Sequence, residues 1–152
     1  HMWDAGVATA KFESVLYLDS DRLWPRTLVD EILAKMNHDT FLFTSQHFML
    51  LQNIPLPSCK RFLNSQDAGI LMDDEFFGKI RYEPRWPQPQ RSYGKNVMSG
   101  GTAFTKTTYF KAGPVDPWYR GHGAFADTDF HQQASVRGCK FIDLKMPELH
   151  LP

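Results

Sequence analysis

The chain has 152 residues, of which 42% are hydrophobic and 14% aromatic, and its 17 basic residues balance its 17 acidic ones. This length and composition predict one globular domain with a sizeable core, and no segment has the run of about 18 apolar residues that a membrane helix needs. Because the charges balance, no overall field would draw the chain to nucleic acid or to an anionic membrane surface.

The termini and the cysteines give a simple expectation for organisation and compartment. Residues 1–2 are typical of an expression-tag remnant, so residues 3–152 are treated as a single domain. Cys59 and Cys139 lack the spacing of a disulfide scaffold or a zinc motif. We therefore expect reduced thiols and a cytoplasmic protein.

The first stretch predicts a helix followed by a strand. Residues 3–11 carry Val7 and Ala10 at helical spacing without an N-cap residue, so we expect the chain to enter in the middle of a βα unit. Residues 15–18 are apolar and predict a buried strand at the centre of a sheet, ending at Asp19.

Two carboxylates, Asp19 and Asp21, follow this strand one residue apart. Residues i and i+2 of a strand point to the same side, so the two side chains could converge on one ligand just past the strand end. Oxygen donors at the carboxyl end of a strand suit Mg²⁺ or Mn²⁺. In the alternative interpretation, Asp19 caps the next turn and Asp21 is only solvated.

A helix is predicted over residues 26–37, directly after Pro25, which suits a first helical turn. Its apolar residues form one stripe that is expected to face the core. They are Leu28, Ile32, Leu33 and Met36.

The middle of the chain predicts little further regular structure. Residues 41–44 predict a strand, and residues 45–51 either continue it or form a helical turn. Prolines predict a loop over residues 53–60. The acidic residues 73–75 favour the solvated start of a helix over a second metal site. Residues 82–93 hold three prolines and predict a long surface loop, which is either a lid whose arginines meet phosphate or a packed loop.

A glycine pair, Gly100 and Gly101, interrupts the next apolar stretch, residues 97–106. Here a short strand is expected to run into the glycines, where the backbone can approach a ligand closely. Thr107 or Thr108 is expected to cap the short helix that follows.

The last part of the chain predicts a loop, a helix and a strand. Residues 116–125 form a glycine-punctuated aromatic loop, which leads into a helix that runs from residue 126 to a stop at Gly138. Asp127 near the start of this helix could be only a cap. Residues 141–144 predict the last strand, and residues 147–151 are expected to trail off it.

In this order, the parts resemble glycosyltransferases of the GT-A fold, most closely family 2 enzymes and the C-terminal catalytic segment of galactosyltransferase-type enzymes. The resemblance covers nearly all of the chain. It is carried by residues 3–11, Leu16-Tyr17-Leu18-Asp19-Ser20-Asp21, Ser99-Gly100-Gly101 with Phe104 and Phe110, Gly121-His122-Gly123 before Asp127-Thr128-Asp129-Phe130, and His150.

This resemblance implies an α/β fold, a partial GT-A (Rossmann-like, nucleotide-diphospho-sugar transferase) sandwich with a truncated mixed sheet. The family's first half, which binds the base and ribose of the nucleotide, would lie before Trp3. Without it the sheet would expose an edge, so we expect a homodimer or a separate N-terminal half as a partner.

The resemblance also implies a donor site. Asp19 and Asp21 look like the family's Asp-x-Asp motif, which holds Mn²⁺ or Mg²⁺ on the diphosphate of a nucleotide sugar, and His150 resembles the late histidine that completes the metal site. Gly100 and Gly101 resemble the backbone element beside the donor sugar. The metal would offset the charge that grows on the leaving diphosphate.

On the acceptor side, Asp127 occupies the position of the catalytic base, which takes the proton from the attacking hydroxyl. Trp118, His122 and Asp129 are the implied acceptor-binding residues. The family pattern Gly-Trp-Gly-Gly-Glu-Asp is altered here, with His122 in place of Trp and Ala126 in place of Glu. Asp127 is therefore the one base candidate.

The expected function is metal-dependent transfer of a sugar from a nucleotide diphosphate donor to a hydroxyl of a carbohydrate acceptor. A UDP-sugar is the expected donor. Two alternatives remain open. The chain could be a catalytically inactive, truncated GT-A module that binds carbohydrate or nucleotide, or a dimeric structural remnant.

Overall fold

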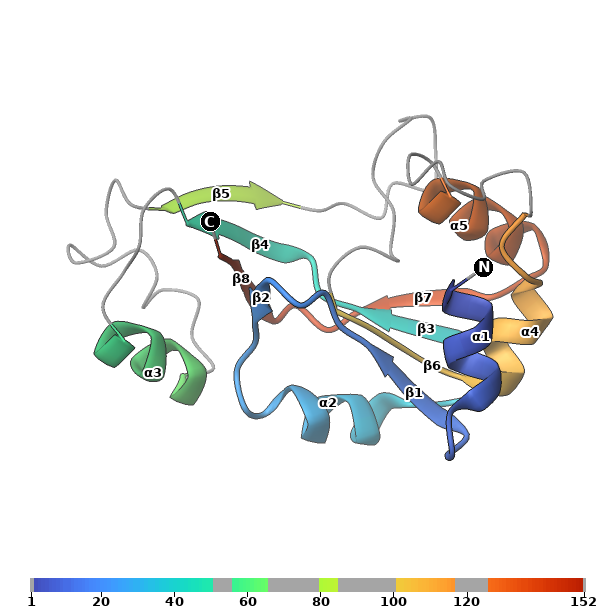
Figure 1. Ribbon diagram of the computed structural model, residues 1–152, viewed down its shortest axis with the longest axis horizontal. Coiled ribbons are helices and arrows are strands. Elements are labelled where there is room, and N and C mark those ends of the chain that lie inside the picture. Colours follow the sequence, from blue (N-terminus) through green and yellow to red (C-terminus); the bar gives the residue numbers. More distant parts are fainter. Residues whose placement is uncertain (1, 51–55, 66–79, 85–100, 117–125, 152) are drawn as a thin grey trace.

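The computed structural model describes five stretches of the chain, residues 2–50, 56–65, 80–84, 101–116 and 126–151. Within them, five helices and eight strands form a mixed α/β fold with two four-stranded sheets (Figure 1). The helices are α1 (Met2–Thr9), α2 (Leu28–Lys35), α3 (Leu56–Asn64), α4 (Lys106–Ala112) and α5 (Ala126–Val136). None of these described helices is long and apolar enough to cross a membrane.

The first sheet has the strand order β1-β6-β3-β7. Strand β6 runs antiparallel to both of its neighbours, whereas β3 and β7 are parallel. The bounds are β1 (Ser14–Tyr17), β6 (Thr102–Thr105), β3 (Thr40–Phe43) and β7 (Lys140–Asp143). All residues of β3 and β6 are buried, so these two strands form the centre of the sheet.

Helices cover both faces of this sheet, because successive side chains of a strand point to opposite sides. Phe41 and Phe104 pack with residues of α1, α4 and α5. Their chain neighbours Leu42 and Ala103 pack instead against α2. The core is therefore divided into two layers, one on each side of the β3–β6 pair.

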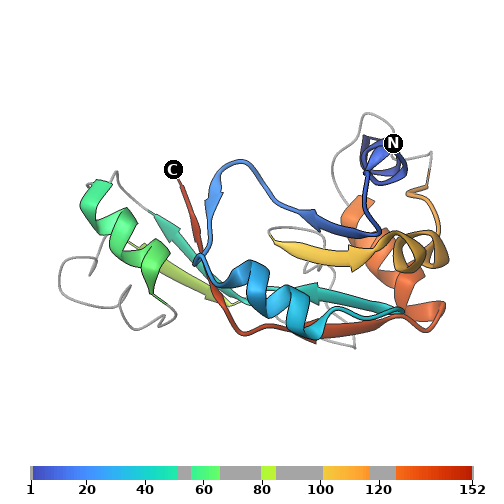
Figure 2. The ribbon, with the colours of Figure 1, turned by 90° about the horizontal axis from the view of Figure 1, so that it is seen from below.

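The second sheet has the order β2-β8-β4-β5 and follows the first along the long axis of the molecule (Figure 1, Figure 2). Strand β8 is antiparallel to β2 and parallel to β4, and β5 is antiparallel to β4. The bounds are β2 (Arg22–Leu23), β8 (Pro147–His150), β4 (Gln46–Leu50) and β5 (Ile80–Pro84). Helix α3 packs on this sheet through Phe62.

Three connections pass from the first sheet to the second, β1 to β2, β3 to β4 and β7 to β8. Each spans only a few residues, so polar side chains at these crossings are brought to one junction between the sheets. This junction contains the candidate site.

The structure confirms several predicted elements and corrects others. Helices α1, α2 and α5 and strands β1, β3 and β7 lie within a few residues of their predicted positions. Strand β1, however, is half-buried at an edge of the sheet described here rather than buried at its centre. The same apolar sequence is compatible with an edge strand and with a central strand, because only the neighbouring strands distinguish the two positions. Leu33 of the predicted core stripe is 64% exposed.

The loops predicted over residues 53–60 and 82–93 were partly wrong. Helix α3 begins at Leu56 and places Pro57 in its first turn, where the missing N–H of proline costs nothing. Residues 82–84 belong to β5, where Pro84 is the last residue of the strand. The rest of 82–93 lies outside the described residues, as does the acidic cluster 73–75.

Other corrections concern strands and caps. Residues 46–50 form β4 in the second sheet, and residues 147–150 form β8 rather than a tail. Strand β6 begins directly after Gly101, and the strand predicted to run into the glycine pair lies outside the described residues. Thr105 caps α4, because its Oγ1 accepts the hydrogen bond from the backbone N–H of Thr108 at 3.0 Å.

Gly101 lies against the indole ring of Trp24. A Cβ atom at this position would stand 2.8 Å from Trp24 Nε1 and 3.1 Å from Cε2. The ring is partly buried against the core layer that contains α2, so an added methyl group at residue 101 would push against this packing. Glycine at this position therefore has a packing role whatever its part in ligand binding.

We predict that Gly101→Ala lowers the free energy of unfolding by about 1 to 3 kcal/mol, because the added methyl group overpacks the indole. Gly6→Ala is the matched control. Gly6 lies within α1 and a Cβ there would meet nothing within 4 Å, so the exchange should be neutral or stabilising. Urea unfolding of both variants measures the difference, and equal stabilities would contradict the packing role of Gly101.

Candidate functional site

Two predicted metal ligands, Asp21 and His150, meet at the junction of the sheets. Asp21 lies in the β1–β2 connection and His150 ends β8, where it is the register partner of Arg22 on β2. His150 Nε2 is 3.0 Å from Asp21 Oδ2. Both side chains reach solvent, since Asp21 is 56% and His150 25% exposed.

Asp19 is held by an arginine of the same turn. Arg22 Nε donates to Asp19 Oδ2 at 2.8 Å and lies 4.0 Å from Asp21 Oδ1. The two carboxylates thus converge, but the group between them is a guanidinium. Strand β1 ends at Tyr17, so the geometry of a turn rather than that of a continuing strand brings them together.

A buried ion pair lies behind these carboxylates. Arg22 Nη1 donates to Glu148 Oε1 at 2.8 Å, and the two side chains are 8% and 0% exposed. Thr44 Oγ1 donates to the other carboxylate oxygen, Oε2, at 2.6 Å, and the backbone N–H of Gly101 points to the same oxygen at 3.4 Å. Glu148 is therefore satisfied by groups from three separate segments of the chain.

His47 of β4 completes the buried cluster. Its Nδ1 is 2.8 Å from Glu148 Oε1 and 2.9 Å from Arg22 Nη1. According to its tautomer, this nitrogen either donates to the carboxylate or accepts from the guanidinium. The His47 and His150 rings lie 5.6 Å apart, so the buried cluster is continuous with the exposed pair.

The site carries negative charge. Three carboxylates (Asp19, Asp21 and Glu148) and one guanidinium leave a formal charge of −2 when both imidazoles are neutral. The hydrogen bond with His150 holds the pKa of the Asp21 carboxyl below its usual value, so this side chain is a carboxylate at neutral pH.

Two of the three predicted metal ligands, Asp21 and His150, are engaged with each other, since Asp21 Oδ2 and His150 Nε2 are within hydrogen-bond distance at 3.0 Å. Nδ1 of His150 is buried without a hydrogen-bond partner, so the polar contact of the ring is made through Nε2. Asp19 is engaged by Arg22. Within the described ranges, no group of three His, Cys, Asp or Glu side chains is arranged to hold a metal ion.

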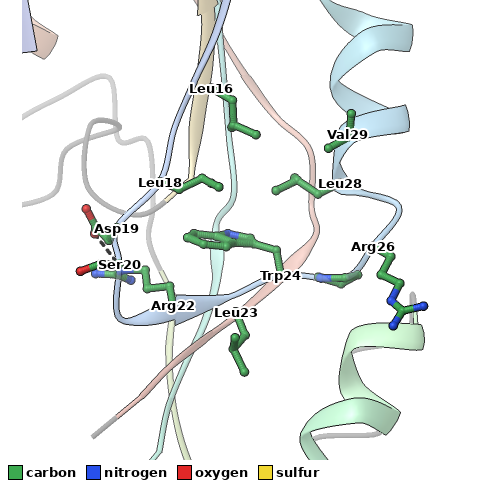
Figure 3. Close-up of a pocket in the computed structure, with 11 residues that line it drawn as sticks. Leu16, Leu18, Asp19, Ser20, Arg22, Leu23, Trp24, Arg26, Leu28 and Val29 are labelled. Carbon is green, nitrogen blue, oxygen red and sulfur yellow. Dashed lines mark hydrogen bonds and ion pairs between the residues drawn. The ribbon is translucent and has the colours of Figure 1, made fainter. Parts of the chain in front are cut away.

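A pocket of about 460 Å³ opens beside the cluster, between the end of β1 and α2 (Figure 3). Its walls are mainly apolar, and the indole of Trp24 lies across its middle. Asp19 and Arg22 stand at one end and Arg26 at the other. The volume lies within the range of small-molecule sites, which are usually apolar with a few polar groups.

The other predicted site residues are not brought to this junction by the described contacts. Gly100, Trp118 and His122 lie outside the described residues. Asp127 is in the first turn of α5, and its side chain is also outside them. Asp129 accepts a hydrogen bond from Gln133 of the same helix, which packs on the first sheet through Phe130.

The sequence reasoning missed the buried cluster altogether. Thr44, His47 and Glu148 each stand next to apolar residues that become buried in strands or at their ends. A polar side chain inside such a run is the signal that could have found them, because it must be paired once it is buried. The neighbouring sequence does not reveal which residue is the partner, since Glu148 is 126 residues from Arg22.

Comparison of the chain with known protein families and with curated proteins finds no match.

We predict that Thr44→Val destabilises the fold by about 1 to 3 kcal/mol, because a buried carboxylate oxygen of Glu148 loses a short hydrogen bond. Thr40→Val is the matched control, since Thr40 is equally buried on β3 but its Oγ1 has no hydrogen-bond partner in the part of the chain that the structure describes. That exchange should be neutral or stabilising. Denaturant titration compares the two, and a Thr44→Val variant as stable as Thr40→Val would contradict the role of Thr44.

Proposed function

We propose that the chain is a metal-dependent glycosyltransferase of the GT-A type, which moves a sugar from a nucleotide diphosphate to an acceptor hydroxyl. The observation that carries the proposal is the contact between Asp21 and His150, two residues 129 positions apart in the sequence. The resemblance assigns these two residues to one metal site, and a close approach of both is what that assignment requires.

The arrangement of the first sheet supports a partial GT-A sandwich. It is a mixed sheet between helices, and the Asp-Ser-Asp turn leaves it at the end of β1. Strand β1 pairs with β6 alone among the described residues, so no described strand covers its other edge. An open edge needs a partner, and we propose that an N-terminal half or a second copy pairs there.

The proposed roles follow from position and chemistry. Asp21 and His150 would hold Mn²⁺ or Mg²⁺, which when bound neutralises charge on the leaving diphosphate. Asp19 faces the pocket beside the cluster, where a UDP-sugar donor would place its polar groups. Gly100 and Gly101 remain proposed donor contacts, and Trp118, His122 and Asp129 remain proposed acceptor contacts.

Asp127 is the proposed base. It belongs to the first turn of α5. As a carboxylate within reach of the acceptor, it would take the proton of the attacking hydroxyl.

We expect UDP to bind with Mn²⁺ and not without it, and Asp21→Ala to abolish this binding with little loss of stability, since the Asp21 carboxylate is 56% exposed. Calorimetric titration with and without the metal measures both effects. Asp30→Ala, which removes an exposed carboxylate of α2, is the control and should bind as the parent chain does. UDP affinity that is unchanged in Asp21→Ala would exclude the metal assignment.

For Asp127→Asn, we expect loss of donor hydrolysis or transfer by about 10²- to 10⁴-fold, with metal-dependent UDP affinity retained, because a general base acts on the acceptor proton and not on the nucleotide. Product analysis with a panel of UDP-sugars, beside the titration described above, separates the two effects. Turnover at the parent rate in this variant would remove Asp127 as the base.

A binding module without turnover is the second candidate. It is favoured by the pairing of Asp19 with Arg22, which engages one of the two motif carboxylates. Metal-dependent UDP binding without hydrolysis or transfer of any donor would support this candidate over the enzyme.

A further inference from the structure

We propose that strand β1 pairs with β1 of a second copy of the chain, antiparallel and with Val15 opposite Val15, so that the partner's Lys11 lies beside Asp19 of the candidate site. Of the two partners named above for this edge, the second copy is the one that fits. The pairing does not depend on the transfer of a sugar, since the contacts that carry it lie along the edge of the first sheet.

Strand β1 is an unprotected edge of the first sheet (Figure 1). It pairs with β6 on one side, and no described strand covers the other. Its sequence, Ser-Val-Leu-Tyr, contains no proline and no charged residue. On the other side of the sheet, β7 begins with Lys140 and ends with Asp143. Charges on an edge strand discourage pairing with another chain, whereas an uncharged edge such as β1 invites it.

The backbone groups of β1 that face the open edge belong to Ser14 and Leu16. The N–H of Lys106 donates to the carbonyl oxygen of Glu13 at 2.8 Å and continues the β1–β6 register. Residues of an antiparallel strand bond alternately to one side and to the other, so alternate residues counted from Glu13 are bonded toward β6. Ser14 and Leu16 are thereby placed to bond a further strand.

Side-chain faces and backbone bonds together restrict the register. Side chains directly opposite each other in an antiparallel pair lie on the same face of the sheet. Val15 packs with the layer that contains α1, whereas Leu16 packs with the layer that contains α2. With Val15 on the two-fold axis, like faces meet, and Ser14 lies opposite the partner's Leu16. The outward-facing backbone groups of these two residues can then exchange hydrogen bonds.

This register also matches the exposed apolar side chains at the two ends of β1. Phe12 and Leu18 are 69% and 44% exposed, and they lie opposite each other across the interface. The contact occurs twice, because an interface on a two-fold axis is isologous. A shift that puts Leu16 on the axis would instead place Glu13 opposite the partner's Asp19, and like charges directly opposite are destabilising.

The same register supplies the candidate site with a cation. Lys11 lies opposite the partner's Asp19. In the described part of the chain, the Lys11 ammonium contacts the Phe12 ring at 5.4 Å and has no carboxylate partner. The cluster that contains Asp19 carries net negative charge when both imidazoles are neutral. A lysine from each copy therefore complements the charge of the other copy's site.

Sedimentation velocity of Ser14→Pro over a range of concentrations tests the pairing. Proline at this exposed first residue of β1 removes an N–H that faces the open edge, and such a position tolerates it. Two hydrogen bonds of the symmetric dimer are lost, so we expect the dissociation constant to rise by about 10- to 100-fold. Ser14→Ala keeps the N–H and is the matched control, with a change below about twofold. Near-UV circular dichroism establishes that both variants are folded.

Lys11→Gln tests the contact with the partner's Asp19 and leaves the backbone of β1 unchanged. Two exposed ion pairs are lost per dimer, so the dissociation constant should rise by about 2- to 10-fold. Added salt should weaken the parent dimer more than this variant. Lys35→Gln is the control, since it removes the same charge from α2, where the ammonium is 2.7 Å from Glu31 of the same helix.

Pairs of introduced cysteines and mild oxidation test the register. The double variant Phe12→Cys with Leu18→Cys should give a covalent dimer on a non-reducing gel, because the two positions lie opposite each other. Phe12→Cys with Ser20→Cys is displaced by two residues, about 7 Å along the strand, and should give none. The parent chain controls for the native thiols, Cys59 and Cys139.

A parent chain that stays monomeric up to its solubility limit overturns the pairing. A dimer that is equally tight in folded Ser14→Pro and Ser14→Ala also overturns it, because another surface then forms the dimer. A covalent dimer from the Ser20 pair in place of the Leu18 pair overturns the register.

Equal dissociation constants for Lys11→Gln and Lys35→Gln overturn the placement of the partner's Lys11 beside Asp19. The proposed function has its own readout in UDP binding. A monomer that binds UDP overturns the pairing alone, and a dimer that binds no UDP overturns the proposed function alone.

Discussion

The buried ion pair between Glu148 and Arg22 is the interaction on which the arrangement of the junction depends. A carboxylate without solvent contact is unfavourable by several kcal/mol unless donors surround it, and loss of one partner of such a pair typically destabilises a protein by about 3 to 5 kcal/mol. Here the donors come from β2, from the β3–β4 crossing and from the start of β6. The Glu148 carboxylate therefore requires all three segments to be in place. Its ion pair with Arg22 lies within the second sheet, and its contacts with Thr44 and Gly101 connect that sheet to the first.

This requirement explains why the candidate site lies at the junction. Short connections bring Asp19, Asp21 and Thr44 out of the first sheet, while β8 carries Glu148 and His150 into the second. The buried polar groups neutralise one another, whereas Asp21 and His150 remain in reach of solvent. The exposed Asp21–His150 pair therefore lies above an interior whose polar side chains are held in place by their own contacts. Gly101 links the same junction to the pocket through its close packing on Trp24.

Local sequence patterns predicted helices and strands best where the spacing of apolar residues or a single capping residue was enough to define the element. The apolar stripe of α2, the apolar runs of β1 and β3 and the glycine stop after α5 are of this kind. Predictions were wrong where tertiary contacts decided. Pro57 was taken to exclude a helix, yet a first turn tolerates it. Leu33 was placed in the core, yet α2 meets the sheet only through the side that carries Leu28 and Ile32.

The sequence by itself determined the types of chemistry available: a pair of aspartates after an apolar strand, a late histidine, and enough apolar residues for one core. Those are local properties, because side-chain chemistry and strand or helix periodicity act over a few residues. Only the tertiary structure decided that Asp21 meets His150, that Arg22 stands between the motif carboxylates, and that Glu148 holds this arginine from the interior. These contacts join residues up to 129 positions apart, and strand register, which no local pattern encodes, brings them together.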